Sequence, residues 1–121
     1  MSVLVELDKL ADTAADFDLA YLITVGGDAG SGAHVLAITP EITGDGIVCG
    51  GLGRHSLGNA TANANVTLVW APAAATDYSL IVDGEAAVDG EQIVVTPRKA
   101  ILHRPARDPS GARTGNDCQP V

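Results

Sequence analysis

Short apolar runs separated by turn residues are the feature of this sequence that most constrains its fold. The runs are rich in valine, isoleucine, leucine and alanine, and glycine, aspartate or proline lies close to their ends. Runs of this length suit β-strands better than helices. The strands predicted from this pattern cover residues 19–25, 33–42, 47–49 and 65–70 and two segments within 78–96. About six strands with turns between them predict a mainly β protein, a small antiparallel barrel.

The turn residues predict how neighbouring strands are joined. The segment GGDAGSG at 26–32 joins the first two strands as a hairpin with a longer loop, and TGDG at 43–46 forms the next turn. Asp89-Gly90 has the residue types of a two-residue hairpin turn. Gly84 falls inside a strand, where a glycine indicates a bulge or the close approach of a neighbouring backbone.

Two segments have helical character. Residues 3–16 place leucines at helical spacing with acids on the other face, which predicts an amphipathic helix ahead of the strands. Residues 55–63 are too small and polar for a core strand. They are predicted to form a short helix between strands, with Ser56 as a possible N-cap.

Length and composition predict one domain. Residues 1–105 are long enough to bury a hydrophobic core, whereas residues 106–121 offer little to bury and are expected to be flexible or ordered by a partner. Cys49 and Cys118 have neither metal-ligand spacing nor a disulfide framework around them, and they are interpreted as two unpaired thiols.

Acidic charge dominates the first 97 residues, which hold thirteen Asp and Glu against Lys9 and Arg54. The net charge of the whole chain is −8, although residues 98–121 are positive. Nucleic acid is not an expected partner, because clustered Lys and Arg supply most of its affinity. No apolar run is long enough to span a bilayer, and the first residues lack the layout of a signal peptide, so we expect a cytoplasmic protein without a membrane partner.

Arg54 is the most informative charged residue. It lies with His55 and Ser56 in the stretch GGLGRHSLGNATANANVTLVW at 50–70, after a glycine-rich strand end and before the short helix. One Arg with a few backbone N–H groups can hold a phosphate. A lone Arg in an acidic protein can equally cap a loop or pair with an acid, and the residues alone leave both interpretations open.

Three phrases of the sequence carry a resemblance to a known family. They are LAYLITVGGDAGSGAHVLAITPEITGDGIVCGG, then NANVTLVW after the short helix, then YSLIVDGEAAVDGEQIVVTP. Together they resemble the split-barrel FMN-binding family typified by pyridoxamine 5′-phosphate oxidase, and are especially similar to its small actinobacterial members that group with flavin and deazaflavin oxidoreductases. The likeness covers roughly residues 3–105 and implies a six-stranded antiparallel split barrel with an N-terminal helix and a short helix between strands.

The resemblance also implies a cofactor site. The phosphate-binding phrase of the family, a small hydroxyl residue followed by Arg and Lys with an Asn three further on, falls on Arg54, His55, Ser56 and Asn59. The residue types differ from those of the family phrase, because Ser56 stands at the Lys position and His55 at the Arg position. The flavin ring is expected along the backbone of 35–39 and 47–51. The ring-site residues implied in this way are Val35, Ile38, Thr39, Val48, Gly50 and Gly51.

The activity implied by the resemblance is that of an oxidoreductase that uses FMN, or alternatively a deazaflavin, on a small organic substrate. The family further implies a homodimer. Two alternatives stay open: a domain that binds flavin or another small ligand without turnover, and a homodimer that has lost the cofactor and serves as an interaction module. FMN titration followed by absorbance or fluorescence separates them.

The remaining candidate residues indicate structure more than chemistry. His34 is interpreted as a half-exposed structural residue at the start of a strand, and Trp70 as a buried strand residue. With His55 and His103, His34 makes three isolated histidines without a partner at ligand spacing, so no metal site is predicted. Nothing resembles a strong general acid or base, and the catalytic residues stay unknown.

Overall fold

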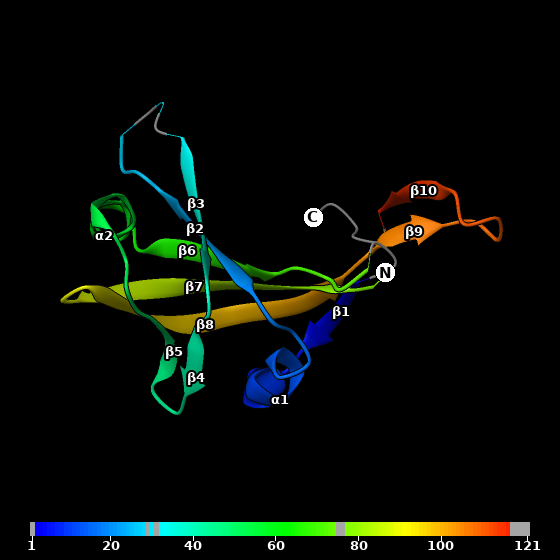
Figure 1. Ribbon diagram of the computed structural model, residues 1–121, viewed down its shortest axis with the longest axis horizontal. Coiled ribbons are helices and arrows are strands. Elements are labelled where there is room, and N and C mark those ends of the chain that lie inside the picture. Colours follow the sequence, from blue (N-terminus) through cyan, green and yellow to red (C-terminus); the bar gives the residue numbers. More distant parts are fainter. Residues whose placement is uncertain (1, 29, 31, 75–76, 117–121) are drawn as a thin grey trace.

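The computed structural model describes residues 2–28, 30, 32–74 and 77–116. Within them, an eight-stranded antiparallel sheet curls into a half-barrel in the order β3-β2-β6-β7-β8-β5-β4, and β1 pairs with the far part of β8 (Figure 1). The strands are β1 (Ser2–Val5), β2 (Ala20–Val25), β3 (Ala33–Ile38), β4 (Glu41–Thr43), β5 (Gly46–Cys49), β6 (Asn65–Trp70), β7 (Ser79–Asp89), β8 (Gln92–His103), β9 (Pro105–Arg107) and β10 (Arg113–Asn116). The helices are a 3-10 turn at Leu7–Lys9, α1 (Leu10–Ala14) and α2 (Arg54–Ala62).

This architecture confirms the predicted fold class, a mainly β antiparallel split barrel with one helix near the N-terminus and one between strands. The main sheet has eight strands rather than the six predicted, because two predicted elements have other boundaries. Residues 2–5 form strand β1 rather than the start of a helix, since alternating valines suit a strand and the backbone pairs with β8, Val5 opposite Ala100. The run at 33–42 divides at Pro40, which has no N–H to donate to a sheet, and β4 begins after it.

The long β7–β8 hairpin is the central element of the sheet. Its turn at Asp89-Gly90 is confirmed: Asp89 pairs with Gln92, and Gly90 has φ +63°. The bulge at Gly84 is confirmed as well, because the register shifts between Asp83 and Gly84. A Cβ on Gly84 would lie 2.6 Å from Val95 Cγ1 and 2.7 Å from the Thr96 carbonyl oxygen, so only glycine fits there.

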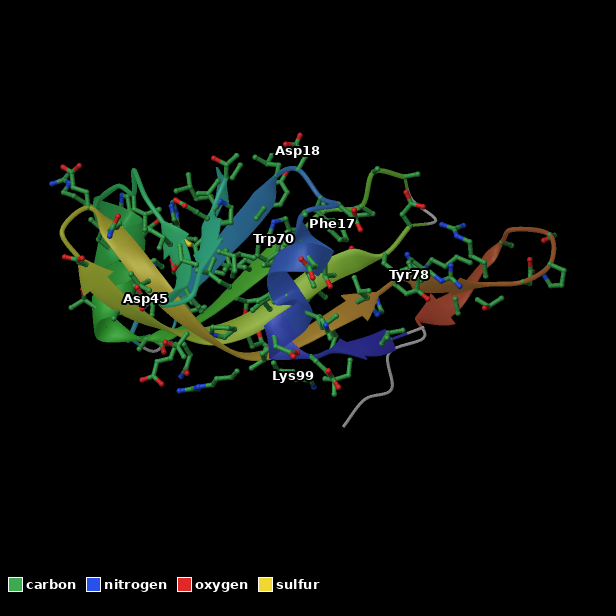
Figure 2. All side chains as sticks on the ribbon, turned by 90° about the horizontal axis from the view of Figure 1, so that it is seen from below. Phe17, Asp18, Asp45, Trp70, Tyr78 and Lys99 are labelled. Atoms are coloured by element: carbon green, nitrogen blue, oxygen red, sulfur yellow. The ribbon has the colours of Figure 1, made fainter. Side chains whose placement is uncertain are left out.

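Alternating burial along the strands builds the core on one face of the curled sheet. In β6 and the first part of β7, every second residue is buried, as the two-residue period of a strand requires. Trp70 is 3% exposed, which confirms it as a core residue. Leu10 of α1 is also buried, and Figure 2 shows α1 lying against the sheet close to Trp70. Helix α1 therefore closes one side of the core.

A small hairpin follows the main sheet. β9 and β10 pair with each other and extend beyond the end of β8 (Figure 1). Its turn is held by Asp108, whose carboxylate accepts from the backbone N–H of Ser110 and of Ala112, each at 3.0 Å. The domain division at residue 105 and the mobility of the tail stay predictions; Cys118 and the rest of 117–121 lie outside the described residues.

Within the described part of the chain, neither helix has the length or the apolar content that crossing a membrane requires.

Candidate functional site

Helix α2 lies at the turn end of the β7–β8 hairpin. The loop that precedes it is tied down where Leu52 N–H donates to the Glu91 carbonyl at 3.0 Å. Just after the helix, Ala86 N–H of β7 donates to the Ala64 carbonyl at 2.7 Å. Both ends of α2 are therefore anchored to the hairpin, and its first turn has a defined position.

The first turn of α2 presents backbone donors. The N-cap is Gly53, not Ser56 as expected: Ser56 is the third helical residue, and its side chain is buried. The first i→i−4 bond runs from Leu57 N–H to the Gly53 carbonyl at 3.1 Å, so the N–H groups of the three preceding residues have no partner within the helix. A Cβ on Gly50, Gly51 or Gly53 would meet nothing within 4 Å. The approach to these donors is therefore open.

One face of α2 packs against β2 and β3. His55 and Asn59 lie one turn apart on it, and Asn59 Nδ2 donates to the buried Thr24 Oγ1 at 3.2 Å. The ring of His34 lies 5.7 Å from that of His55, centroid to centroid, tilted by 33°. Thr24 and His34 are cross-strand neighbours. His34 thus belongs to the candidate site, although its place in the sequence gave no local sign of this.

Arg54 is exposed at the start of α2 and has no ion-pair partner among the described carboxylates. His34 and His55 also have no ion-pair partner among the described carboxylates. In the described part of this acidic chain, the alternative that Arg54 pairs with a nearby acid is therefore not observed. Arg54 and His55 follow one another in the first turn of α2, and His34 lies beside His55, with no described counterion for any of the three.

The other predicted site residues spread from this cluster. Gly50 and Gly51 lie in the open loop before α2, and Val48 is half-buried in β5. Val35 follows His34 on β3 and is 55% exposed. Ile38 is buried at the end of β3, and Thr39 lies just beyond it. The structure gathers Arg54, His55, Asn59 and the two glycines, while Ile38 and Thr39 lie farther along the strand.

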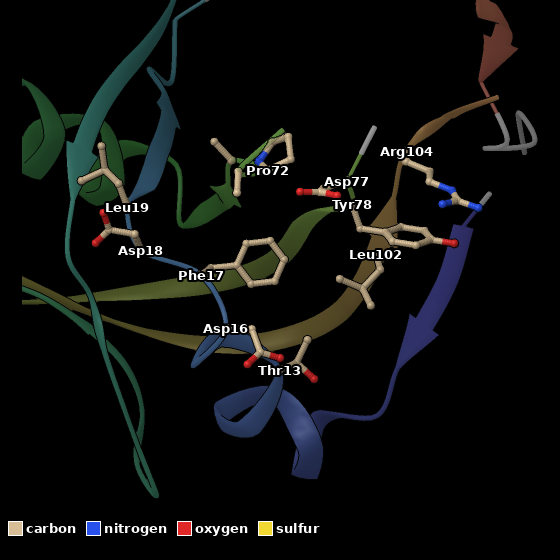
Figure 3. A pocket seen from close by; sticks show the side chains of 12 residues that line it. Thr13, Asp16, Phe17, Asp18, Leu19, Pro72, Asp77, Tyr78, Leu102 and Arg104 are labelled. Carbon is tan, nitrogen blue, oxygen red and sulfur yellow. The ribbon is translucent and has the colours of Figure 1, made fainter. Parts of the chain in front are cut away.

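A concave surface lies at the open end of the β7–β8 hairpin, away from α2. Its volume is about 890 Å³. Figure 3 shows the Phe17 ring in its wall, with Asp18 and Leu19 on one side and Tyr78 and Leu102 on the other. The lining residues are Thr13, Asp16, Phe17, Asp18, Leu19, Ala71, Pro72, Ala73, Asp77, Tyr78, Leu102 and Arg104.

The chemistry of this pocket differs from that of the α2 cluster. The Arg104 guanidinium lies 4.6 Å above the centre of the Tyr78 ring, a cation–π contact. Three aspartates share the rim with this single Arg. Sequence reasoning missed the pocket, because its residues come from four separate segments and form no motif.

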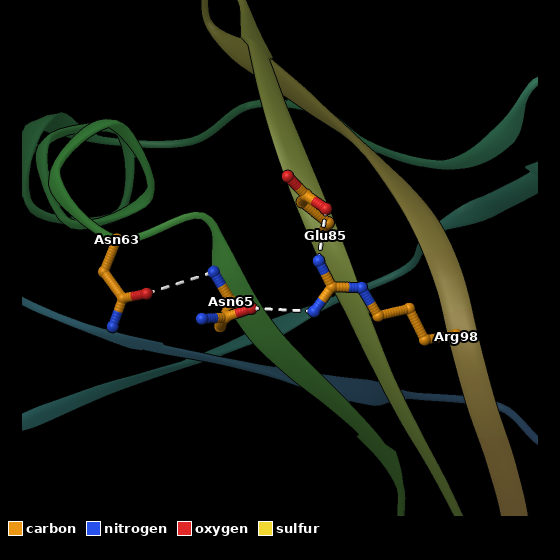
Figure 4. A network of polar contacts seen from close by, with 4 residues as sticks. All are labelled: Asn63, Asn65, Glu85 and Arg98. Atoms are coloured by element: carbon orange, nitrogen blue, oxygen red, sulfur yellow. Dashed lines mark hydrogen bonds and ion pairs between the residues drawn. The ribbon is translucent and has the colours of Figure 1, made fainter.

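A polar network supports the chain after α2. Arg98 bridges Glu85 and Asn65, donating to Asn65 Oδ1 at 3.0 Å, and Asn63 Oδ1 accepts from the Asn65 backbone N–H at 3.1 Å (Figure 4). The Arg98 and Glu85 side chains are each 55% exposed. This network orders the entry into β6 and is not a binding cluster. No group of three metal-ligating side chains occurs among the described residues.

No protein-family model matches this chain. An uncharacterized protein of Mycobacterium bovis and one of Mycobacterium tuberculosis are each 36% identical to it, over 84% of this chain and 82% of theirs. Among solved structures, the FAD binding protein from Mycobacterium smegmatis superposes with a TM-score of 0.59 at 16% identity, covering 84% of this chain and 97% of that one. The chain shares the fold of that structure and belongs to the family of the two mycobacterial relatives.

Proposed function

We propose that this chain binds a flavin nucleotide, with the phosphate at the start of α2, and acts as an oxidoreductase on a small organic substrate. FMN is the proposed cofactor, and a deazaflavin is the alternative. The observation that carries the proposal is the open first turn of α2, where Arg54 and His55 are exposed and the ring of His34 lies 5.7 Å from that of His55, with no described carboxylate partner for any of the three. A solved protein of the same fold described as FAD binding supports a flavin.

The groups at this site suit a phosphate. The Arg54 guanidinium offers a planar pair of donors, and the exposed His55 offers a further N–H. Backbone N–H groups of the first turn of α2 add donors along the helix dipole. The glycines at 50, 51 and 53 leave the space into which a bulky anion would fit. Asn59 already donates to Thr24, so its role is to hold α2 against β2 rather than to bind the phosphate.

A bound flavin supplies the hydride or electron transfer. The protein binds its phosphate at α2 and orients its ring by the backbone of β3 near Val35 and of β5 near Val48. We assign no catalytic acid or base. In the same proposal the protein is a cytoplasmic homodimer, and exposed apolar residues on the outer face of the sheet, Leu4, Tyr21 and Val35 among them, support contact with a second copy.

A second candidate function is a split barrel that binds a small ligand without turnover or has lost its cofactor. The observation that favours it is Ser56: this residue stands at the Lys position of the family phrase, and its side chain is buried in the helix interface. The phosphate site then has one permanent cation, Arg54, in place of two.

Titration of FMN into the purified protein, followed by flavin fluorescence, tests the proposal. We expect saturable quenching at micromolar concentration, and Arg54→Ala is expected to weaken binding at least about tenfold, equivalent to about 1.4 kcal/mol. The melting temperature should stay nearly unchanged, because Arg54 is exposed and makes no described ion pair.

The matched control is Arg107→Ala, an exposed Arg on β9 beyond the other end of the sheet, which should bind FMN as the parent protein does. Normal FMN binding by Arg54→Ala would refute the site. Absence of FMN binding by the parent protein leaves the deazaflavin titration to decide between the two cofactors and the second candidate function.

A further inference from the structure

The pocket at the open end of the β7–β8 hairpin is assembled by strand pairing. Leu19 and Ala71 come directly beyond the last pair of β2 and β6, and Tyr78 and Arg104 come directly beyond the last pair of β7 and β8. All four residues line the pocket. Its volume of about 890 Å³ is in the range of small-molecule sites, about 300–1,000 Å³. Two strand pairings thus end at one cavity of the size that a small ligand needs.

The two loops around this pocket are held by their own hydrogen bonds. Phe17 N–H donates to the Ala14 carbonyl at 3.0 Å, and the Phe17 side chain is partly buried against the core. On the other side, Asp77 N–H donates to the Ala74 carbonyl at 3.0 Å, and Asp77 Oδ2 accepts from Ala74 N–H at 3.1 Å. The walls therefore exist without a ligand, so a ligand does not have to order them.

The walls of the pocket are apolar and aromatic. The Phe17 ring lies in the wall together with Pro72 and Leu102 (Figure 3). The Tyr78 ring carries the Arg104 guanidinium 4.6 Å from its centre, as expected for an aromatic face that attracts a cation. A ligand with an apolar body can pack on these side chains, and a positive charge on it is compatible with the rings.

Carboxylates surround these walls. Asp16, Asp18 and Asp77 line the pocket, with Arg104 as the one basic residue among the described lining residues. The structure describes neither a hydrogen bond nor an ion pair of the Asp16 or Asp18 carboxylate. Arg104 lies over the ring of Tyr78. The pocket therefore has an excess of negative charge, which repels anions and leaves two carboxylates available to a cation.

We propose that this pocket binds a small organic cation, an amine on an aromatic or other apolar body. The apolar body packs on Phe17, Pro72 and Leu102, and the ammonium group lies among the aspartates. Both features are needed, because exposed acids alone attract any cation weakly and an apolar wall alone has no preference for charge. The pocket lies away from α2, so this site is separate from the proposed flavin site and does not depend on it.

Titration of three compounds with the same ring tests the charge preference. They are phenethylamine, which is cationic, phenethyl alcohol, which is neutral, and phenylacetate, which is anionic. Backbone amide shifts in the NMR spectrum report both the affinity and the place of binding. We expect phenethylamine to bind with a dissociation constant of about 1 mM, at least about fivefold below that of phenethyl alcohol, and phenylacetate to bind more weakly than either. The shifts should be concentrated around Phe17, Leu19 and Tyr78.

Substitutions separate the charge from the ring. Asp16→Asn should raise the phenethylamine constant about threefold and leave the phenethyl alcohol constant unchanged, because it removes one charge from an exposed side chain. Asp12→Asn is the matched control: Asp12 is exposed on α1 and does not line the pocket, so both constants should stay as in the parent protein. Phe17→Leu should weaken phenethylamine and phenethyl alcohol alike, since both pack on the ring.

Three results would overturn the inference. The first is equal affinity for phenethylamine and phenethyl alcohol, and the second is an equal effect of Asp12→Asn and Asp16→Asn. The third is a set of shifts that spreads over the acidic surface without saturating, which would show unspecific attraction of a cation. FMN is absent from the experiment, so each of these results leaves the proposed flavin site intact.

Discussion

At the turn end of the β7–β8 hairpin the surface offers Arg54, two histidines and open backbone donors, whereas at its open end the surface is apolar, aromatic and acidic. The turn end carries Arg54, the two histidines and the open glycine loop. The open end carries the pocket of about 890 Å³ around Phe17 and Tyr78. One pair of strands therefore supports two surfaces of different chemistry.

The difference arises from the connections and not from the strands. Strands β7 and β8 bury the same kinds of aliphatic residue along their length. At the turn end, glycine-rich connections leave backbone N–H groups accessible, which suits an anion. At the open end, the β6–β7 connection and the segment after α1 contribute Pro72, Phe17 and aspartates. The chemistry of the two surfaces is thus determined by short connections between shared strands.

The largest effect expected from a single substitution comes from the hairpin that both ends share. Gly84→Ala should lower the free energy of unfolding by about 2–3 kcal/mol, because its Cβ would overlap the Thr96 carbonyl oxygen and Val95. Chemical denaturation measures the loss. Gly58→Ala is the matched control: its Cβ meets nothing within 4 Å inside α2, so helix propensity should make it neutral or stabilising by up to about 1 kcal/mol. Equal stability of the two variants would contradict the close approach at the bulge.

Alkaline pH should lower the free energy of unfolding through Cys49, which pairs with Ile93 near the turn end. Burial raises the pKa of this thiol from 9.0 to about 12. The unfolded chain loses the thiol proton near pH 9 and the folded chain keeps it, so the contribution of the neutral thiol is complete below pH 9 and is lost as the pH rises toward 12. The free energy of unfolding should fall by about 1.4 kcal/mol per pH unit within this window. Cys49→Ala should fall less steeply, and equal slopes would refute the assignment.

The contact between α2 and β2 lies at the turn end, so weakening it tests whether the two ends are independent. Thr24→Val keeps the shape of the buried side chain but removes the acceptor of the Asn59 Nδ2 hydrogen bond, so we expect a loss of about 1 kcal/mol. Amide hydrogen exchange should speed up in α2 and stay unchanged where β1 pairs with β8. Faster exchange at both ends would show that they are not independent. Thr13→Val in α1, whose hydroxyl donates to the Lys9 carbonyl at 2.9 Å, is the control at the other end.

Local signals in the sequence were sufficient to predict most of the strands and turns of the main sheet. The Asp89-Gly90 turn and the Gly84 bulge followed from glycine chemistry, and the alternating valines and leucines of β6 followed from the period of a strand. Residues 2–5 were missed because their conformation depends on pairing with His103 and its neighbours, about a hundred positions away. Amphipathic spacing alone cannot report such a partner.

The candidate site stays a prediction, and only part of it could be proposed from the sequence, for the same physical reason. Arg54, His55 and Asn59 lie within six residues, and the family resemblance implies all three from this one stretch. His34 joins them only because α2 packs on β3, and Ser56 turned inward because the third position of α2 faces the core. The Phe17–Tyr78 pocket needs four segments to be assembled before any of its chemistry is visible.

The smallest expected effect lies midway along the hairpin, where Arg98 pairs with Glu85. Both side chains are 55% exposed, so water and salt screen the ion pair and offset the cost of ordering two long side chains. Arg98→Ala should therefore change the free energy of unfolding by less than about 1 kcal/mol, part of it from the hydrogen bond to Asn65, and the difference should shrink at high salt. Thermal denaturation at low and high salt measures this, with Lys99→Ala on the same strand as control. A larger loss accompanied by weaker FMN binding would mean that the network in Figure 4 positions α2. The network would then belong to the turn-end site rather than to the supporting sheet.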